Sequence, residues 1–245
     1  MALIIDDIGN DLAHGRGAVE LPGPLACAFL PHTPHAASLA RLAGARGKEV
    51  LLHQPMEARG SNHLLGPGAL RLDMPADDMR RVLSDNLSAV PGAVGLNGHM
   101  GSAFTSEKRA MATLMHLISA RRGAGPGLYF VDSRTTTGSV ARPSAALYEV
   151  PFIQRDVFLD NDRDIQAITD QLEALRRIAH QRGYAVGIGH PHPETLAVLR
   201  EALPELASRY GLELVSVEAL IERTRLSRAR QTLARPPRPG PVTMH

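Results

Sequence analysis

The stretch ALIIDDIG (residues 2–9) joins a short apolar run to two adjacent carboxylates, Asp6 and Asp7. The β-branched isoleucines in the run favour a strand that is buried on both faces, and the two carboxylates stand at its carboxyl end. Carboxylates in this position are often helix caps or loop residues. In α/β folds, however, the carboxyl ends of strands are also where ligands and catalytic groups gather. The role of the pair therefore depends on which other polar residues reach the same place.

Strand-like runs recur along the chain, with helical stretches between them. After the first strand they are LACAFLP (25–31), EVLLHQP (49–55), AVGLNGH (93–99), GLYFVDS (127–133), YEVPFI (148–153), YAVGIGH (184–190) and LELVSV (212–217). The spacing of apolar residues predicts amphipathic helices over 34–46, 76–90, 107–121 and 164–181. Alternating strands and helices are typical of an α/β protein with a mostly parallel sheet, arranged either as a barrel or as a doubly wound sheet.

Five of the expected strands end in polar residues of metal-ligating or catalytic type. In chain order these are Asp6 and Asp7, His53, Asn97 and His99, Asp132 and Ser133, and His190 and His192. In a parallel sheet that is closed or nearly closed, these strand ends share one rim, so residues far apart in sequence converge there. Neutral imidazoles together with carboxylates suit a divalent transition metal, most often zinc, with positions left open for water and substrate.

Composition predicts one globular domain over residues 1–222 and a basic, Pro- and Arg-rich tail over residues 223–245. Of the 27 basic residues, six arginines follow Glu222, the last acidic residue, so the body has 21 basic against 25 acidic residues. The body therefore lacks the basic surface expected of a nucleic-acid-binding protein. Because the tail is poor in apolar residues and rich in proline, we expect it to be disordered.

Several classes of protein lack support in the sequence. It contains no Gly-x-Gly-x-x-Gly dinucleotide motif, no phosphate-binding loop and no Gly-x-Ser-x-Gly nucleophile elbow. The single cysteine, Cys27, lies in an apolar run and is expected to be a core residue. Neither a signal peptide nor a membrane-spanning segment is recognisable. With no Trp and 4% aromatic residues, the chain also lacks the stacking platforms that often hold long glycans.

Seven stretches of the chain together resemble a known family, the divergent branch of the polysaccharide deacetylases. They are IDDIG (5–9), FLPHTPHAASLARLA (29–43), EVLLHQPME (49–57), GLNGHMGSAFT (95–105), YFVDSRTT (129–136), RDVFLDN (155–161) and GIGHPHPET (187–195). The resemblance runs from Ala2 to about Leu220 and implies a distorted (β/α)7-type barrel with mostly parallel strands. It also implies a hydrolase that removes an N-acyl group, such as acetyl, from a carbohydrate or polysaccharide.

The same resemblance implies roles for individual residues. Asp6 corresponds to the general base and Asp7 to a metal ligand, while His190 stands where the family keeps a general acid. The family's His-x-x-x-His metal motif has no clear counterpart, because EVLLHQPME offers only His53 and Glu57 at that spacing. We therefore assign Asp7, His53 and His99 as ligands of one divalent metal, with zinc as the expected ion.

A second group of residues is expected to support the site or contact the substrate: Glu57, Asn97, Ser102, Asp132, Asp156 and His192. Asp132 or Asp156 could orient an imidazole, which is typically worth about 10- to 100-fold in affinity or activity. The alternative is that these carboxylates cap strand ends or pair with Arg134 or Arg155. His192 is expected either to face the same mouth or to be turned outward before Pro193.

Two other interpretations remain open at this point. The chain could be a non-catalytic barrel with a structural metal or a glycan-binding role, or a metal-dependent amidase that acts on a non-sugar substrate. Retention of both Asp6 and His190 favours catalysis, because a structural metal requires neither base nor acid. The substrates of the resembled family lie outside the cytoplasm, so the expected location is periplasmic or secreted. The sugar, the acyl group and the oligomeric state are not indicated by the sequence.

Overall fold

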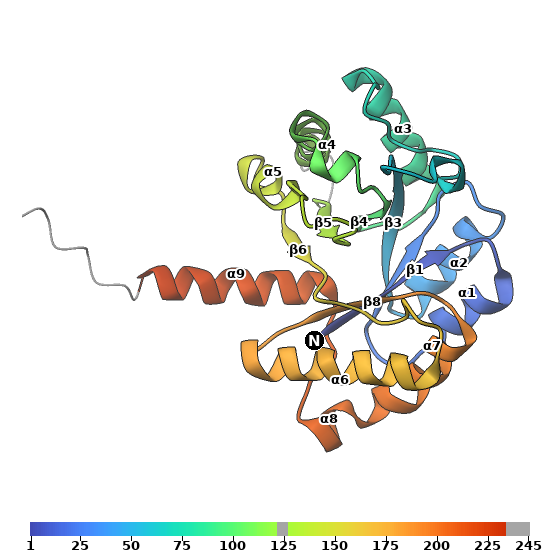
Figure 1. Cartoon of the computed structure of the whole chain (residues 1–245), viewed down its shortest axis with the longest axis vertical. Coiled ribbons are helices and arrows are strands. Elements are labelled where there is room, and N and C mark those ends of the chain that lie inside the picture. The colour runs from blue at the N-terminus through green and yellow to red at the C-terminus, as the bar shows by residue number, and fades with distance from the viewer. Residues whose placement is uncertain (122–126, 234–245) are drawn as a thin grey trace, which may run out of the picture.

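The computed structural model describes residues 1–121 and 127–233 and contains one curled, eight-stranded parallel sheet (Figure 1). Its strands are β1 (Ala2–Ile8), β2 (Ala26–Phe29), β3 (Glu49–Met56), β4 (Gly95–Met100), β5 (Tyr129–Asp132), β6 (Phe152–Gln154), β7 (Val157–Phe158) and β8 (Val186–Gly189). They lie in the order β6-β5-β4-β3-β2-β1-β8-β7. The edge strands β6 and β7 follow each other in the chain but do not pair, so the sheet forms a partly open barrel. The expected barrel with mostly parallel strands is thereby confirmed.

The described helices lie mostly outside the curl of the sheet, and the first six connect its strands (Figure 1). They are α1 (Leu12–Val19), α2 (Ala36–Ala45), α3 (Ala76–Ala89), α4 (Lys108–Ala120), α5 (Ala141–Leu147), α6 (Ile165–Arg182), α7 (Pro193–Ala202), α8 (Leu206–Tyr210) and α9 (Val217–Leu233). None of the helices in this described part combines the length and the apolar character needed to span a bilayer.

The four helices predicted from periodicity are present, and three of them start one or two residues later than predicted. Glu107 and Asp164 are N-caps rather than first helical residues, because their side chains accept hydrogen bonds from the backbone N–H of Ala110 and Ala167. Helix α2 begins after His35, since the Thr33 hydroxyl donates to the carbonyl of Leu30 and does not cap the helix.

The core has two layers, one on each face of the sheet, and strand β1 contributes to both. Its residues alternate between the faces of the sheet, so Ala2 and Ile4 pack inside the curl while Leu3 and Ile5 pack against the helices outside. Both faces are covered, as the continuous apolar run predicts. Cys27 lies in the outer core with no solvent exposure, and burial raises the pKa of its thiol to about 12, so it is a core residue as expected.

The strand predicted over residues 212–217 is wrong. The segment is bonded only to Met1, whose amino group donates to the carbonyl of Glu213 and whose carbonyl accepts the N–H of Val215, so no strand is assigned among the described residues there, and helix α9 begins at Val217. The reason lies in Glu49, at the start of β3, whose carboxylate accepts the N–H groups of Val217 and Glu218. This long-range cap satisfies the first turn of the helix and starts it at that point.

Helix α9 also changes the expected boundary of the domain. The helix continues to Leu233, so a boundary after residue 222 falls inside it, and residues 223–233 are helical rather than disordered. No Gly or Pro occurs between Val217 and Leu233, and residues of good helical propensity carry the helix outward. The remainder of the expected tail, residues 234–245, lies outside the described residues.

Candidate active site and metal centre

Asp6 and Asp7 both turn toward the carboxyl rim because the backbone of β1 is irregular there. Adjacent residues of a regular strand point to opposite faces. Asp7 instead adopts a left-handed conformation (φ 56°), and the pairing of β1 with β2 shifts register between Ile5 and Ile8. As a result, carboxylate oxygens of Asp6 and Asp7 lie 3.8 Å and 3.1 Å from the same atom, Nε2 of His53. Left-handed residues other than Gly are strained and are common at functional sites.

Three side chains from three strands meet at one point on this rim. Oδ1 of Asp7 lies 3.1 Å from Nε2 of His53 and 2.9 Å from Nδ1 of His99, and the two imidazole nitrogens are 3.2 Å apart. Parallel pairing of β3 with β4 places His53 opposite Asn97 and His99 opposite Pro55, which brings both rings to the same end. The structure therefore brings together the three residues that the sequence assigned as ligands.

The chemistry of these donors fits a divalent metal. Oδ1 of Asp7 is buried and has no hydrogen-bond partner among the described residues, although two imidazole nitrogens face it. The three ligand atoms form a compact set that could hold a single ion. One carboxylate with two imidazoles is a donor set that zinc and related ions accept, with positions left for water and substrate.

Asn97 links the cluster to the second carboxylate. Its side-chain oxygen accepts a hydrogen bond from Nδ1 of His53 (2.8 Å), which leaves the lone pair of His53 on Nε2, facing the cluster. Its amide nitrogen donates to Oδ1 of Asp6 (2.7 Å). Asn97 is fully buried and holds both His53 and Asp6 in place, as expected for a residue that supports a metal site.

The pKa values of Asp6 and Asp7 are shifted in opposite directions. Burial raises the pKa of Asp6, with nearby His53 and His190 opposing the shift. Burial would also raise the pKa of Asp7, but the imidazoles of His53 and His99 that face its Oδ1 outweigh burial and hold the pKa well below the usual range. Asp7 therefore stays ionised across the physiological range, while Asp6 holds a proton more readily.

The imidazole of His53 is shifted in the same environment. Burial alone would lower its pKa, but the charges of Asp6 and Asp7 outweigh burial and raise the pKa of His53 to about 9. The ring is therefore protonated near neutral pH when no ion is bound. Binding of a metal at Nε2 has to displace that proton, which couples metal affinity to pH.

His190 reaches the same rim from β8 and is held by Asp160. Nδ1 of the ring lies 2.9 Å from Oδ1 of Asp160, and the other carboxylate oxygen accepts from the N–H of His190 and the hydroxyl of Thr195. Nε2 of His190 faces the cluster, 3.7 Å from Oδ2 of Asp7. Burial opposes protonation, but the hydrogen bond to Asp160 outweighs it and raises the pKa of His190.

The two carboxylates that could orient an imidazole, Asp132 and Asp156, form their hydrogen bonds elsewhere, as the alternative of caps and arginine partners allowed. Asp132 accepts hydrogen bonds from the N–H of Arg134 and the hydroxyl of Ser139, and Asp156 accepts from the N–H of Val186 and pairs with Arg182. Neither bonds to a histidine. Asp160 was missed because the strand before it, β7, has only two residues and gives no periodic signal. The signal that could have found it was its place in the RDVFLDN stretch.

The other expected supporting residues lie on the rim in different roles. The carboxylate of Glu57 accepts the N–H of Leu72, and the hydroxyl of Ser102 accepts the N–H of Arg59. Both contacts hold rim loops and involve none of the clustered histidines. His192 does face the mouth, since its ring lies beside that of His190 with centroids 5.5 Å apart.

Arg155 is a rim residue that the sequence considered only as an ion-pair partner. Its Nε donates to the carbonyl of Ser133 (2.6 Å), and its guanidinium lies over the ring of Phe158, 5.0 Å from the centroid. Phe158 in turn packs against the ring of His190, with centroids 5.1 Å apart. These contacts form one wall beside His190.

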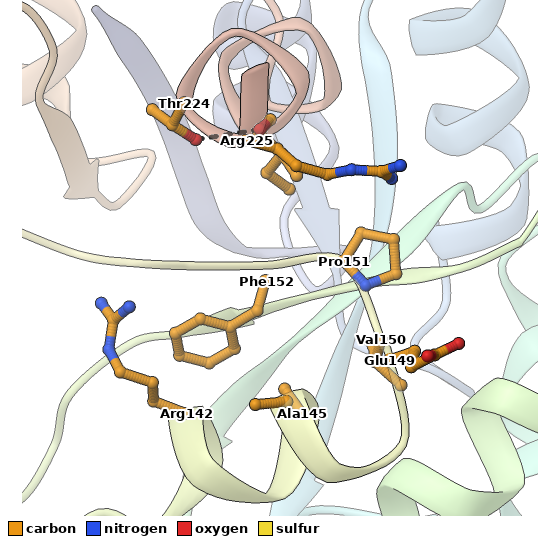
Figure 2. Close-up of a pocket in the computed structure, with 10 residues that line it drawn as sticks. Arg142, Ala145, Glu149, Val150, Pro151, Phe152, Thr224 and Arg225 are labelled. Carbon is orange, nitrogen blue, oxygen red and sulfur yellow. Dashed lines mark hydrogen bonds between the residues drawn. The ribbon is translucent and has the colours of Figure 1, made fainter. Parts of the chain in front are cut away.

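A separate cavity of about 530 Å³ lies at the opposite, amino-terminal end of the sheet (Figure 2). Residues of α5, β6 and α9 line it, among them Arg142, Phe152 and Arg225, and it contains none of the clustered histidines or aspartates. Its described lining contains no histidine, whereas the carboxyl rim gathers several.

Comparisons with known proteins identify the family of the chain. The sequence model of a family described as divergent polysaccharide deacetylase matches residues 3–221. The uncharacterized protein YibQ of Escherichia coli (strain K12) is 35% identical over 206 residues, which are 84% of this chain and 63% of that protein. The chain thus spans less than two thirds of the length of that relative.

Solved structures share the fold. The crystal structure of the uncharacterized protein ATU2773 from Agrobacterium tumefaciens C58 is 26% identical, with a TM-score of 0.83 over 89% of this chain and 87% of that one. The peptidoglycan deacetylase PdaC from Bacillus subtilis is 13% identical, with a TM-score of 0.51 over 96% of each chain, and at this identity the likeness concerns the fold alone.

Proposed function

The chain belongs to the divergent polysaccharide deacetylase family, and from this premise we propose that it is a metal-dependent hydrolase that removes an N-acyl group, acetyl in the simplest case, from a carbohydrate. The observation that carries the proposal is the arrangement around Asp7. The compact set of Asp7, His53 and His99 has the buried carboxylate of Asp6 beside it and Nε2 of His190 facing it. A base, an acid and a set of ligands thus surround one small volume.

The ligand set would hold one divalent ion, zinc in our proposal. When bound, such an ion polarises the acyl carbonyl and lowers the pKa of water toward ~7. Asp7 suits this role because its carboxylate remains ionised, and Asn97 fixes the tautomer of His53 so that Nε2 is available.

Asp6 is the proposed general base. Its Oδ1 is held by the amide of Asn97, and Oδ2 faces His53 on the side of the cluster. A base is most effective when its pKa approaches the working pH, and burial shifts Asp6 in that direction. Asp6 would take one proton from the water whose oxygen bonds to the acyl carbon.

His190 is the proposed general acid. The raised pKa favours the protonated ring, and Asp160 holds Nδ1 so that Nε2 points at the site. Nε2 would donate a proton to the nitrogen as the C–N bond breaks. The products are a free amine on the carbohydrate and a carboxylate, here acetate, so that one water is consumed.

The location that follows from this proposal is outside the cytoplasm, in the periplasm or secreted, where envelope polysaccharides are found. The proposed substrate is an N-acylated glycan of the cell envelope. Support comes from the family to which the chain belongs, together with the open rim beside the cluster.

The test is release of acetate from N-acetylglucosamine oligosaccharides by the zinc- or cobalt-loaded protein. Asp6→Asn should keep its metal and lose about 10²- to 10⁴-fold in turnover, the usual contribution of a general base. Asp11→Asn is the matched control, because Asp11 is an exposed N-cap of α1 on the same rim. Metal binding without acetate release from any N-acetylated sugar would favour the non-catalytic interpretation.

A further inference from the structure

A second group of ligand-type side chains lies beside the proposed active site. We propose that Asp160, His190 and His192 bind a second divalent transition-metal ion, more weakly than the first set, and that this ion blocks His190 as a proton donor. Each of the three residues offers one ligand atom, and these atoms all lie within 4.8 Å of one another.

The contact between Asp160 and His190 already has the spacing of two ligands. Oδ1 of Asp160 and Nδ1 of His190 are 2.9 Å apart. Two atoms that each bind one zinc ion at 2.0–2.1 Å are separated by roughly 3 to 3.4 Å, so a small movement admits an ion in place of the shared proton. The carboxylate of Asp160 is already oriented to bind an ion through Oδ1, because its Oδ2 accepts hydrogen bonds from the N–H of His190 and the hydroxyl of Thr195.

His192 is the third ligand-type residue of this group, and it has no other structural role in the described part of the chain. It is the N-cap of α7, but its side chain makes no capping hydrogen bond. Its ring lies against that of His190 at an interplanar angle of 32°. Both rings are only partly buried, which leaves a path for an ion from solvent.

Several neighbours weaken this second site relative to the first. Arg163 lies close enough to act on His192, and the amino end of α7 carries the positive end of the helix dipole. The first ion would add further positive charge nearby. The second ion therefore binds only at an excess of metal.

Binding of the second ion changes the protonation state of His190. The ion takes the lone pair of Nδ1, and the proton held there is released to solvent. The ring is left neutral and bound, with Nε2 as its only N–H, and loses the imidazolium charge that made it a donor. This effect on turnover rests on the proposed function, whereas the binding itself does not.

The test is a zinc titration of the full, metal-free chain, followed by calorimetry and checked by elemental analysis after dialysis. The wild type should show a tight and a weaker binding step. His192→Gln should weaken the second step by roughly 10- to 100-fold and leave the first unchanged, as expected for loss of one ligand-type contact. His180→Gln, the same change at an exposed histidine on α6, should alter neither step.

The outcomes separate this inference from the proposed function. A second step in His192→Gln equal to that of the wild type, or a wild type whose only step is unchanged in His192→Gln, would overturn the inference. His99→Ala should lose the tight step and keep the weaker one. A wild-type protein with only a His192-dependent step would support this second site while contradicting the first ligand set.

Discussion

Asp6 and Asp7 follow each other in the chain, yet their carboxylates meet different neighbours. Asp6 lies against the amide of Asn97 in a dry environment, whereas Oδ1 of Asp7 lies between two imidazoles. Burial raises the pKa of one carboxyl, and the imidazoles lower that of the other. Two identical side chains can in this way serve as base and ligand, because the environment sets their acidities apart.

The ligand set predicts a loss of metal from a single substitution. His99→Ala removes one of the three donors, Asp7, His53 and His99, so the protein should lose its tightly bound ion, measured as zinc per chain by elemental analysis after dialysis. His63→Ala is the control, because His63 is an exposed histidine of a rim loop. Stoichiometric metal in both variants would rule out His99 as a ligand.

The pair of Asp160 and His190 predicts a shift in the pH profile. The carboxylate of Asp160 raises the pKa of His190, and the proposed acid is active only when protonated. Activity should therefore fall as pH rises through that pKa. Asp160→Asn removes the negative charge and lowers the pKa, so the alkaline limb of kcat/KM should move to lower pH.

Asp156→Asn is the control for this shift, since Asp156 bonds to Arg182 and the N–H of Val186 and does not touch His190. Its alkaline limb should stay where it is in the wild type. An unchanged limb in Asp160→Asn, or an equal shift in both variants, would contradict the assignment of Asp160 as the residue that positions His190.

Among the elements, helix α9 has a structural role in the barrel that its composition does not indicate. Val217, Leu220 and Ile221 on its first turns pack into the inner core with residues of β1 and β8. Glu49 of β3 caps its amino end. The helix therefore closes the amino-terminal end of the barrel, on the far side from the rim that carries the site, and then runs outward from the body (Figure 1).

Two leucines of this helix should contribute very differently to stability. Leu220 is 4% exposed and Leu226 is 60% exposed. Leu220→Ala should lower the free energy of unfolding by about 2–5 kcal/mol, because it leaves a cavity in the inner core. Leu226→Ala should change it by less than about 0.5 kcal/mol. Urea denaturation measures both, and equal effects would mean that the helix does not close the barrel as described.

At the scale of the whole molecule, the carboxyl end and the amino end of the curled sheet have different roles. The carboxyl rim gathers polar residues from β1, β3, β4 and β8, while the amino end is sealed by apolar side chains of α9. This separation lets the core stay dry while one rim remains open to a substrate, as in other α/β barrels.

Removal of residues 226–245 tests how far the folded body extends. The inner core ends at Ile221, so the truncated chain should melt within about 2–4 °C of the full chain, which corresponds to about 1 kcal/mol for a domain of this size. Differential scanning calorimetry measures the difference. A much larger drop would show that residues beyond Arg225 pack against the body.

The sequence by itself determined the alternating strands and helices, the parallel sheet and the polar residues at the strand ends, because apolar periodicity and residue type are local properties. The family also followed from local motifs. Only the tertiary structure decided with what geometry the expected ligands Asp7, His53 and His99 meet, and that Asp160 holds His190. Those contacts depend on strand register and on the left-handed turn at Asp7, which residues distant in sequence impose on one another. For the same reason helix α9 begins where a strand was predicted, since Glu49 caps it from another part of the chain.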